Sequence, residues 1–292
     1  MFSPYVRRLR LAAALRKMRE DRNLTADEVA KTVFQSRGKL SKLETAQTRP
    51  EAFEIMDMLE RLNVTGKEYD NIINLARTAA QKGWWDQHAQ VMGPRQRIYA
   101  DLESGAESIC GYEAVASPVM AQTPAYIEHM VELNKGEGPL TYRPDRMIEA
   151  RMRRQRWLLS QEGPACDIIL DEVVLYRVSV PRVVMSAQLR HMADLVSEGH
   201  VSIRVLPYNA TLDGGMPPKS SFNLYTFPDK RDPKVAVVDT VTTDLVLTDR
   251  TQVARYTKLY KHLCQASLSA EDSVAFFREV ADRFDRETGS ST

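Results

Sequence analysis

One stretch of the sequence, Leu24–Thr45, constrains the fold more than any other. It begins with Thr25, whose hydroxyl can cap a helix, and Glu28 follows three residues later, which is the spacing of a capping box. A second capping residue, Ser36, precedes apolar residues that again recur at helical spacing. The stretch therefore predicts two short helices with almost no linker between them, the arrangement of a helix-turn-helix.

The second of these helices should bury Leu40 and Leu43, which leaves small, cationic and hydrogen-bonding residues outside the core. In a helix-turn-helix the N-terminal part of such a helix meets base edges in the major groove, while neighbouring groups hold phosphates. We expect bases to be read by Arg37, Lys39 and Ser41, and phosphates to be held by Lys42, Thr48 and Arg49. The remaining candidates for contacts with double-stranded DNA are Gln35, Ser36 and, on the first helix of the chain, Arg16.

The flanking sequence completes a small helical bundle. Apolar positions at helical spacing predict helices over residues 6–22, 50–62 and 67–82, so the first eighty residues or so hold five helices and need no strands. Residues 1–50 carry twelve Lys/Arg and five Asp/Glu, although the whole chain of 292 residues has a formal net charge of only +1. A basic head joined to an acidic remainder is the charge distribution of a DNA-binding domain attached to another domain.

Several classes of site are not indicated by the sequence. The three cysteines form no CxxC pair and the five histidines show no paired-ligand spacing, so we expect no disulfide framework, no metal site and no cofactor. No apolar run reaches the roughly 18 residues that a membrane span needs. The basic N-terminal segment is interrupted by arginines and reads as an amphipathic helix rather than a signal peptide, so we expect a cytoplasmic protein without a membrane partner.

The second half of the chain has a different pattern. Residues 84–98, with adjacent tryptophans and a Gly-Pro pair, are expected to form a junction, and the tryptophans are expected to pack rather than to stack on bases. A helix is expected to run from Tyr99 through Ile109, followed later by period-two strands and two final helices. The predicted fold is α+β overall, with an all-α five-helix bundle at residues 1–83, a mixed α+β domain at residues 99–285 and a disordered tail at residues 286–292.

The first domain resembles the lambda-repressor/Cro-like, or XRE, family of DNA-binding domains. The pairs Leu24-Thr25 and Val29-Ala30 and the run Leu40-Ser41-Lys42-Leu43-Glu44 carry this resemblance. The chain differs from the family pattern in two places: Ala26 stands where glutamine often touches phosphate, and Phe34 stands where glycine often forms the turn. The resemblance implies a sequence-specific transcriptional regulator.

The second domain resembles the actinobacterial domain of unknown function DUF5753, which commonly follows such a head. The resemblance rests on the segment Pro118…Gln122-Thr123…Tyr126, on Arg151-Met152-x-Arg154-Gln155 and on Leu170-Asp171-Glu172. It implies a regulator of development or specialised metabolism in filamentous actinomycetes. It also implies a candidate partner, a small DUF397-type protein encoded nearby.

The sequence leaves the role of the second domain open among three hypotheses, of which the first two are compatible with each other and the third is an alternative to both. It can bind a partner or ligand, with arginines near a carboxylate recognising an anion or an acidic face; the candidate residues are Gln122, Thr123, Tyr126, Arg151, Arg154 and Glu172. The same arginines can equally pair with Asp171 or Glu172 inside the domain. The domain can also form a homodimer, which would join two heads on two half-sites.

The competing reading gives the second domain an activity of its own, as an enzyme or a toxin-antitoxin-like interaction protein. Asp171 and Glu172 form a carboxylate pair, but adjacent residues of a strand point to opposite faces of the sheet. No P-loop, nucleophile elbow or metal-ligand motif accompanies them. We therefore expect no enzymatic activity and no catalytic residues.

Overall fold

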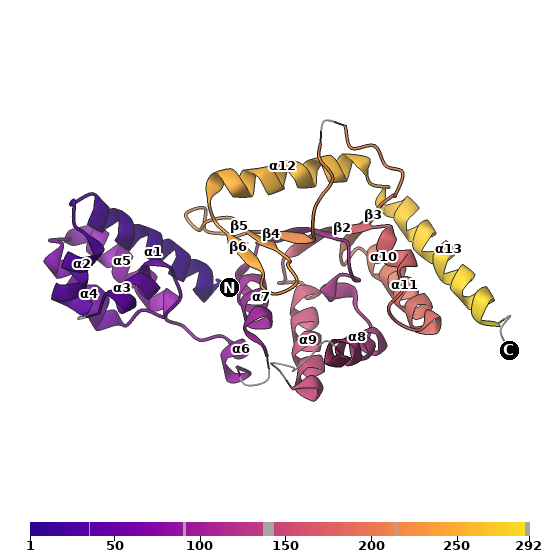
Figure 1. The fold of residues 1–292 in the computed structure, drawn as a ribbon, viewed down its shortest axis with the longest axis horizontal. Helices are drawn as coiled ribbons and strands as arrows, with labels where there is room; N and C mark the ends of the chain where they lie inside the picture. The colour runs from indigo at the N-terminus through magenta and orange to yellow at the C-terminus, as the bar shows by residue number, and fades with distance from the viewer. Residues whose placement is uncertain (35, 90–91, 137–142, 214, 290–292) are drawn as a thin grey trace. The chain divides into compact units, whose positions relative to one another are not determined.

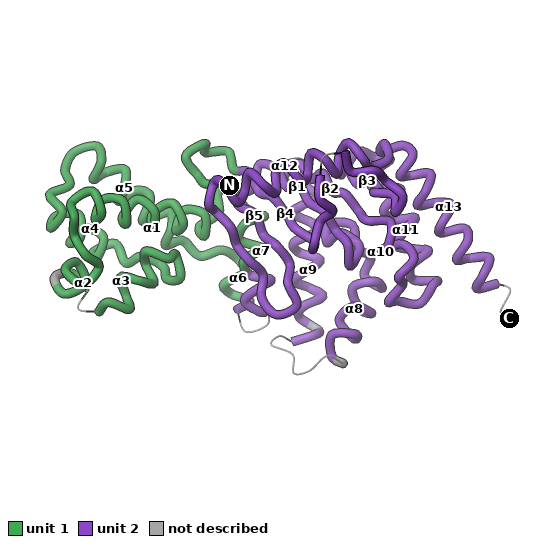
Figure 2. The backbone as a smooth tube through the Cα atoms, turned by 45° about the horizontal axis from the view of Figure 1, so that its top comes forward, with its two compact units in different colours: residues 1–87, 98–105, 227–233 green, residues 88–97, 106–226, 234–292 purple. Residues whose placement is uncertain are grey.

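A computed structural model describes residues 1–292 of the chain except 35, 90–91, 137–142, 214 and 290–292. The described residues fall into two compact units, coloured separately in Figure 2. Unit 1 comprises residues 1–87, 98–105 and 227–233, and unit 2 comprises residues 88–97, 106–226 and 234–292. Unit 1 is helical and unit 2 holds a sheet with helices, which confirms the predicted α+β class.

Unit 1 contains the five predicted helices, which we call the head. One π-helical turn, η1 (Ala30–Phe34), continues the second helix directly, and a short helix, α6 (Trp84–Gln87), follows the fifth. The helices of the head are α1 (Pro4–Glu20), α2 (Ala26–Val29), α3 (Arg37–Glu44), α4 (Ala52–Arg61) and α5 (Gly66–Ala79).

The head has one apolar core, to which every one of its helices contributes. Its fully buried members include Leu15 of α1, Leu40 of α3 and Ile55, Met58 and Leu59 of α4. These residues recur at spacings of three and four along their helices, so each helix turns one apolar stripe inward. The helical periodicity of the sequence therefore built this core as predicted.

The N-terminal part of α1 is held by polar contacts within unit 1. The carboxylate of Asp101, in α7 (Pro94–Gly105), is buried and accepts hydrogen bonds from the Ser3 hydroxyl at 2.5 Å and from the Tyr5 amide at 2.9 Å. One turn further along α1, Arg7 and Arg10 approach Asp229 at 3.0 and 2.9 Å. These contacts satisfy charges that would otherwise be costly to bury.

Unit 2 is organised around a six-stranded mixed sheet with the order β3-β2-β1-β4-β5-β6. The first three strands of this order are parallel, and the pairs β1–β4, β4–β5 and β5–β6 are antiparallel. The strands are β1 (Ser108–Glu113), β2 (Ala165–Asp171), β3 (Ser202–Leu206), β4 (Phe222–Thr226), β5 (Val235–Val238) and β6 (Leu245–Leu247).

Helices cover the sheet of unit 2 on both sides. Figure 1 shows α12 (Arg250–Ala266) along one face and α9 (Pro144–Leu158) on the other side. The α12 face is closed by a core that includes Phe222, Val253 and Leu263. A further pair of helices, α11 and α13, is joined by Arg190, which approaches Asp282 at 2.6 Å and Asp285 at 2.7 Å. The remaining helical elements are η2 (Val119–Ala121), α8 (Pro124–Gly136), α10 (Val173–Tyr176), α11 (Arg182–Ser197) and α13 (Ala270–Gly289).

The structure corrects the expected helix from Tyr99 through Ile109. Helix α7 ends at Gly105, and Ile109 belongs to β1, where it lies beside Cys166 of β2. The apolar spacing continued across the helix end by coincidence, and the glycine marked the real boundary. The expected tail begins inside α13, which runs to Gly289, while its residues 290–292 lie outside the described part. None of the described helices is long and apolar enough to cross a membrane.

Candidate nucleic-acid interface

The capping box that opens α2 is present as predicted. The Thr25 hydroxyl accepts a hydrogen bond from the Glu28 amide at 3.2 Å, and the Glu28 carboxylate accepts one from the Thr25 amide at 2.7 Å. This backbone hydrogen bond lowers the pKa of Glu28 because it favours the ionised carboxylate. Beyond α2, Phe34 ends the π-helical turn and is buried in the head core, which explains an apolar residue in place of the expected glycine.

Helix α3 has the predicted buried and exposed faces. The Ser36 hydroxyl caps it by accepting a hydrogen bond from the Lys39 amide at 3.4 Å, and Leu40 and Leu43 are buried. The other residues of α3 before Leu43 are exposed, and they are Arg37, Gly38, Lys39, Ser41 and Lys42. Because the core fixes the two leucines, the cationic side of α3 is turned toward solvent.

Two of the candidate base-reading residues form ion pairs with neighbouring helices of the head. Arg37 approaches Asp27 of α2 at 3.3 Å, and Lys39 pairs with Glu54 of α4. The side chains of Arg37 and Asp27 are 74% and 55% exposed, and exposed pairs of this kind contribute at most about 1 kcal/mol. Nucleic acid can therefore displace Asp27 from Arg37 at a cost of at most about 1 kcal/mol. Gln35, the first of the candidates, lies outside the described residues.

In the loop after α3, the candidate phosphate-binding residue Arg49 already has a partner within unit 1. The Arg49 guanidinium donates to both carboxylate oxygens of Asp86 at 2.7 Å, and Asp86 also accepts a hydrogen bond from the Gly83 amide at 2.8 Å. The neighbouring Thr48 hydroxyl lies 3.5 Å from the Arg49 carbonyl oxygen. Asp86 therefore competes with a phosphate for Arg49, whereas Lys42 is exposed on α3.

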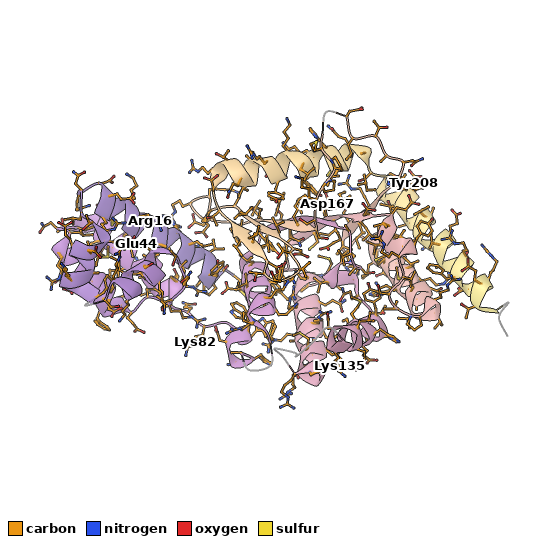
Figure 3. All side chains as sticks on the ribbon, in the orientation of Figure 1. Arg16, Glu44, Lys82, Lys135, Asp167 and Tyr208 are labelled. Carbon is orange, nitrogen blue, oxygen red and sulfur yellow. The ribbon has the colours of Figure 1, made fainter. Side chains whose placement is uncertain are left out.

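Arg16 of α1 lies at the C-terminal end of α3. Its guanidinium donates a hydrogen bond to the Glu44 carbonyl oxygen at 2.9 Å, and Figure 3 labels the two residues in the head. A cation at this position stabilises a helix, because the last carbonyl groups lack partners within the helix. Since the Arg16 side chain is 48% exposed, it keeps a solvent-facing surface beside α3.

A second arginine of α1 makes a contact that the sequence analysis missed. Arg19 binds the Glu44 carboxylate through two hydrogen bonds, from Nε at 2.7 Å and from Nη2 at 2.9 Å, and it also donates to the Leu24 carbonyl oxygen at 2.9 Å. The side chains of Arg19 and Glu44 are 11% and 7% exposed. Arg19 thereby ties α1 to both ends of the helix-turn-helix. In the sequence, the residue that indicated this contact was Glu44, the last residue of the run Leu40-Ser41-Lys42-Leu43-Glu44.

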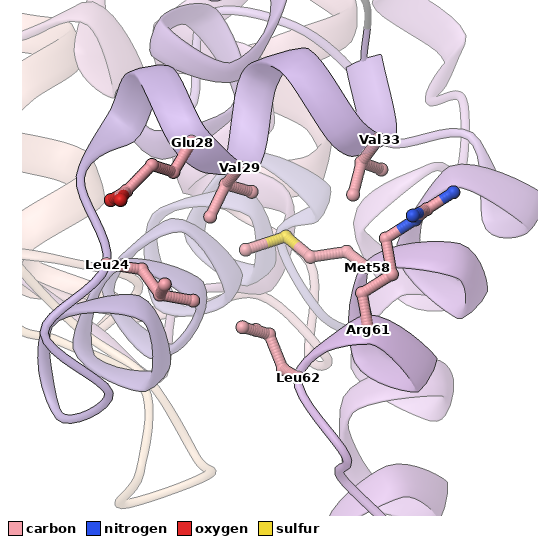
Figure 4. A pocket seen from close by; sticks show the side chains of 7 residues that line it. All are labelled: Leu24, Glu28, Val29, Val33, Met58, Arg61 and Leu62. Carbon is pink, nitrogen blue, oxygen red and sulfur yellow. The ribbon is translucent and has the colours of Figure 1, made fainter.

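A small apolar pocket of about 320 Å³ lies in the head between α2, η1 and α4. Figure 4 shows Leu24, Val29, Met58 and Leu62 converging on it. Its two charged residues already have partners, because Glu28 belongs to the capping box and Arg61 approaches Asp57 at 3.1 Å. Both charges of the pocket lining therefore already take part in contacts within the head.

Three of the candidate residues in the second domain support the backbone around η2. Gln122 donates to the Ser117 carbonyl oxygen at 2.7 Å, the Tyr126 hydroxyl accepts from the Ser117 amide at 3.2 Å, and the Thr123 amide donates to Gln188 of α11 at 2.7 Å. Gln122 and Tyr126 are buried. The structure brings these three residues together as a hydrogen-bonded loop inside unit 2.

The other three candidates of the second domain lie outside this loop, two of them on α9 and the third, Glu172, directly after β2. Arg154 is buried on α9 and donates a hydrogen bond to Gln96, whereas Glu172 accepts one from the Tyr208 amide at 2.8 Å. Arg151 lies one helical turn before Arg154 and is partly exposed. No described group of three or more His, Cys, Asp and Glu side chains is arranged to hold a metal ion.

The compact bundle, with a capped short helix leading into a second helix that presents cations, defines a helix-turn-helix domain, the class found in DNA-binding regulators. Residues 10–71 match the family described as a helix-turn-helix domain. Residues 96–279 match the domain of unknown function DUF5753, and the chain belongs to this family. No curated protein and no solved structure matches the chain.

Proposed function

We propose that the protein is a sequence-specific DNA-binding transcriptional regulator of the XRE type, from the actinobacterial branch, and that it acts in the cytoplasm. The observation that supports this proposal best is the exposed face of α3. It carries Arg37, Lys39, Ser41 and Lys42, while two buried leucines on the same helix anchor it in the core. Entry of α3 into the major groove would place Arg37, Lys39 and Ser41 at base edges and Lys42 at the phosphates.

The ion pairs of α3 support a role in discriminating between DNA sequences. Arg37 and Lys39 face Asp27 and Glu54 when no DNA is present, so nonspecific phosphate contacts must compete with these carboxylates. A guanine that Arg37 contacts through two hydrogen bonds offsets the loss of the Asp27 contact, because such a pair contributes about 1–3 kcal/mol of discrimination.

Control of the head by the family-matched region is the second part of the proposal. Helix α1 binds Asp229, from within the DUF5753 match, through Arg7 and Arg10, and it binds Glu44 of α3 through Arg16 and Arg19. A partner that alters the segment around Asp229 would therefore act on α1, which also holds α3. We propose a small DUF397-type protein as this partner and a homodimer as the DNA-bound form. The alternative is a separate activity in the second domain, to which our proposal assigns no reaction.

The test begins with the full-length chain and a pool of random duplexes. We expect enrichment of symmetric sites whose half-sites are about one helical turn apart, as two joined heads require. Binding to the enriched site and to random duplex is then measured by fluorescence anisotropy over a range of salt concentrations. Recovery of a random pool would refute sequence-specific binding, and recovery of unpaired half-sites would refute the dimer.

Matched substitutions test the assigned roles. We expect Arg37→Ala to cost about 1–3 kcal/mol on the enriched site and to relax the preference at one base pair. Lys42→Ala should weaken both duplexes alike and reduce the salt slope by about 1. Arg61→Ala is the control for the first, since Arg61 is also an exposed arginine paired with an aspartate, and Lys17→Ala is the control for the second. Equal losses for reader and control variants would contradict the assignment.

A further inference from the structure

The fold brings together two cysteines that are 154 positions apart in the sequence. Cys110 on β1 lies directly beside Asp167 on β2, and Asp167 lies beside Ser202 on β3. Residues paired in register point to the same face of a sheet, and this face is the one that α12 covers. On α12, Tyr260 and Cys264 are four residues apart and so share one side of the helix. We call Cys110, Asp167, Arg204, Tyr260 and Cys264 the thiol cluster.

The charged centre of the thiol cluster is Arg204 on β3. Its Nη2 atom lies 3.2 Å from the Cys264 sulfur and 3.0 Å from the Asp167 carboxylate, and Nη1 donates to the Cys264 carbonyl oxygen at 3.4 Å. A guanidinium that donates to sulfur favours the thiolate over the thiol, and the thiolate is the reactive form of cysteine. Cys264 is partly exposed, so a small oxidant can reach it.

Tyr260 connects the second cysteine to the cluster. Its hydroxyl donates to the Asp167 carbonyl oxygen at 2.9 Å, and Asp167 lies in register with Cys110. Cys110 is also partly exposed, and burial raises the pKa of its thiol, with Asp167 adding to the effect. Cys110 therefore remains a thiol at neutral pH. Arg204 contacts both Cys264 and Asp167, and Asp167 lies in register with Cys110, so the two cysteines lie on the same face of the sheet beneath α12.

The remaining cysteine has a contrasting environment. Cys166 precedes Asp167 on β2, so its side chain points to the opposite face of the sheet. It is 7% exposed, and its thiol donates to the Pro164 carbonyl oxygen at 3.5 Å. Each molecule thus carries its own unreactive reference thiol.

We propose that Cys264 is oxidised by hydroperoxides and that Cys110 then converts it to an intramolecular disulfide. In the first step the Cys264 thiolate attacks the peroxide oxygen; the O–O bond breaks, an alkoxide or hydroxide leaves, and a sulfenic acid forms on Cys264. In the second step the Cys110 sulfur attacks the sulfenic sulfur, and the S–O bond breaks. The leaving hydroxide takes the Cys110 proton as water. The peroxide gains the two electrons that the cysteine pair loses.

The test exposes the reduced full-length protein to hydrogen peroxide and follows each cysteine by peptide mass spectrometry. We expect a Cys110–Cys264 crosslink that dithiothreitol reverses, while Cys166 is modified at least about tenfold more slowly. In Cys110→Ser, a dimedone adduct should accumulate on Cys264, and Cys264→Ser should give neither crosslink nor adduct. Modification of Cys166 as fast as Cys264, or irreversible oxidation without a crosslink, would overturn the proposal.

A third variant tests the activation by Arg204. We expect Arg204→Gln to slow alkylation of Cys264 by iodoacetamide several-fold at neutral pH, because the thiolate loses its donor. Cys166 reports on folding in the same sample, and the rate is compared only where Cys166 stays protected. If the variant exposes Cys166, the alkylation rates of Cys264 and Cys110 in the native protein replace it. Alkylation of Cys264 no faster than that of Cys110 would refute the activation.

Discussion

Substituting Glu44 with glutamine should loosen α3 from α1. The Glu44 carboxylate accepts two hydrogen bonds from Arg19, at 2.7 and 2.9 Å, in a setting where both side chains are almost buried. Glutamine keeps the shape and one acceptor oxygen, but it removes the negative charge and turns an amide donor toward a guanidinium. The change therefore leaves a nearly buried cation with only the more exposed Glu20, at 3.7 Å, as a counter-charge.

The size of the loss follows from the burial of this pair. Breaking a fully buried pair costs about 3–5 kcal/mol, and an exposed pair contributes at most about 1 kcal/mol. Arg19 retains its hydrogen bond to the Leu24 carbonyl oxygen, so its charge remains partly solvated by the protein. We expect a loss of about 2 kcal/mol, which corresponds to a roughly 30-fold increase in the opening equilibrium of α3.

Native-state hydrogen exchange of the full-length protein measures this quantity locally, without requiring both units to unfold together. Peptides covering α3 and the end of α1 should exchange faster in Glu44→Gln, while peptides of the sheet should not change. Asp57→Asn is the matched control, because the Arg61–Asp57 pair has a similar distance of 3.1 Å but is 49% and 42% exposed. Equal effects of the two substitutions on their own helices would refute the reasoning from burial.

Three further outcomes are expected. Gly83→Ala should cost about 1–3 kcal/mol and shift tryptophan emission to the red, because the new Cβ would lie 2.2 Å from the buried Trp85 ring. The control is Gly38→Ala, whose new Cβ would have its nearest atom at 3.7 Å, and equal thermal stability of the two variants would contradict the clash. Glu113 has a pKa of about 8, raised by burial and then by Asp239. Between its usual value and this one the folded state holds a proton that the unfolded state has lost, so stability falls as pH rises through this window, by up to about 1.4 kcal/mol per unit. Urea unfolding of Glu113→Gln should show a flatter pH dependence from pH 5 to 8, and an unchanged slope would exclude Glu113 as its source. Asp229→Asn should cost about 1–2 kcal/mol and accelerate hydrogen exchange in residues 227–233, because Arg7 and Arg10 lose a shared carboxylate. The control Asp21→Asn, at the exposed Lys17–Asp21 pair, should leave hydrogen exchange in that segment unchanged.

Features set by neighbouring residues were predictable from the sequence. The capping box at Thr25 and Glu28 and the burial of Leu40 and Leu43 depend on spacings of three residues, which a helix converts directly into contacts. The α+β class followed from the change from helical to alternating apolar periodicity along the chain. Local pattern thus carried the architecture of the head.

Features set by distant residues were not predictable. The partners of Arg19, Arg49 and Arg10 are 25, 37 and 219 positions away, so no local spacing announces them. Strand β1 was missed because helical apolar spacing ran on across the end of α7 into Ile109. The cysteines gave no motif because β-sheet register and α12, not sequence proximity, bring Cys110 and Cys264 to one face.

Unit 1 is assembled from three stretches of the chain, and this limits how the head can be transferred to another protein. Its three stretches of chain interlock tightly: a Cβ on Gly105 would lie 2.1 Å from the Ser3 backbone nitrogen, and Asp101 satisfies both Ser3 and Tyr5. A fragment cut after the fifth helix would therefore expose surfaces that residues 98–105 and 227–233 normally cover. An exchange of heads that preserves these contacts must carry those two distant segments along, so the head of this chain is not an interchangeable module.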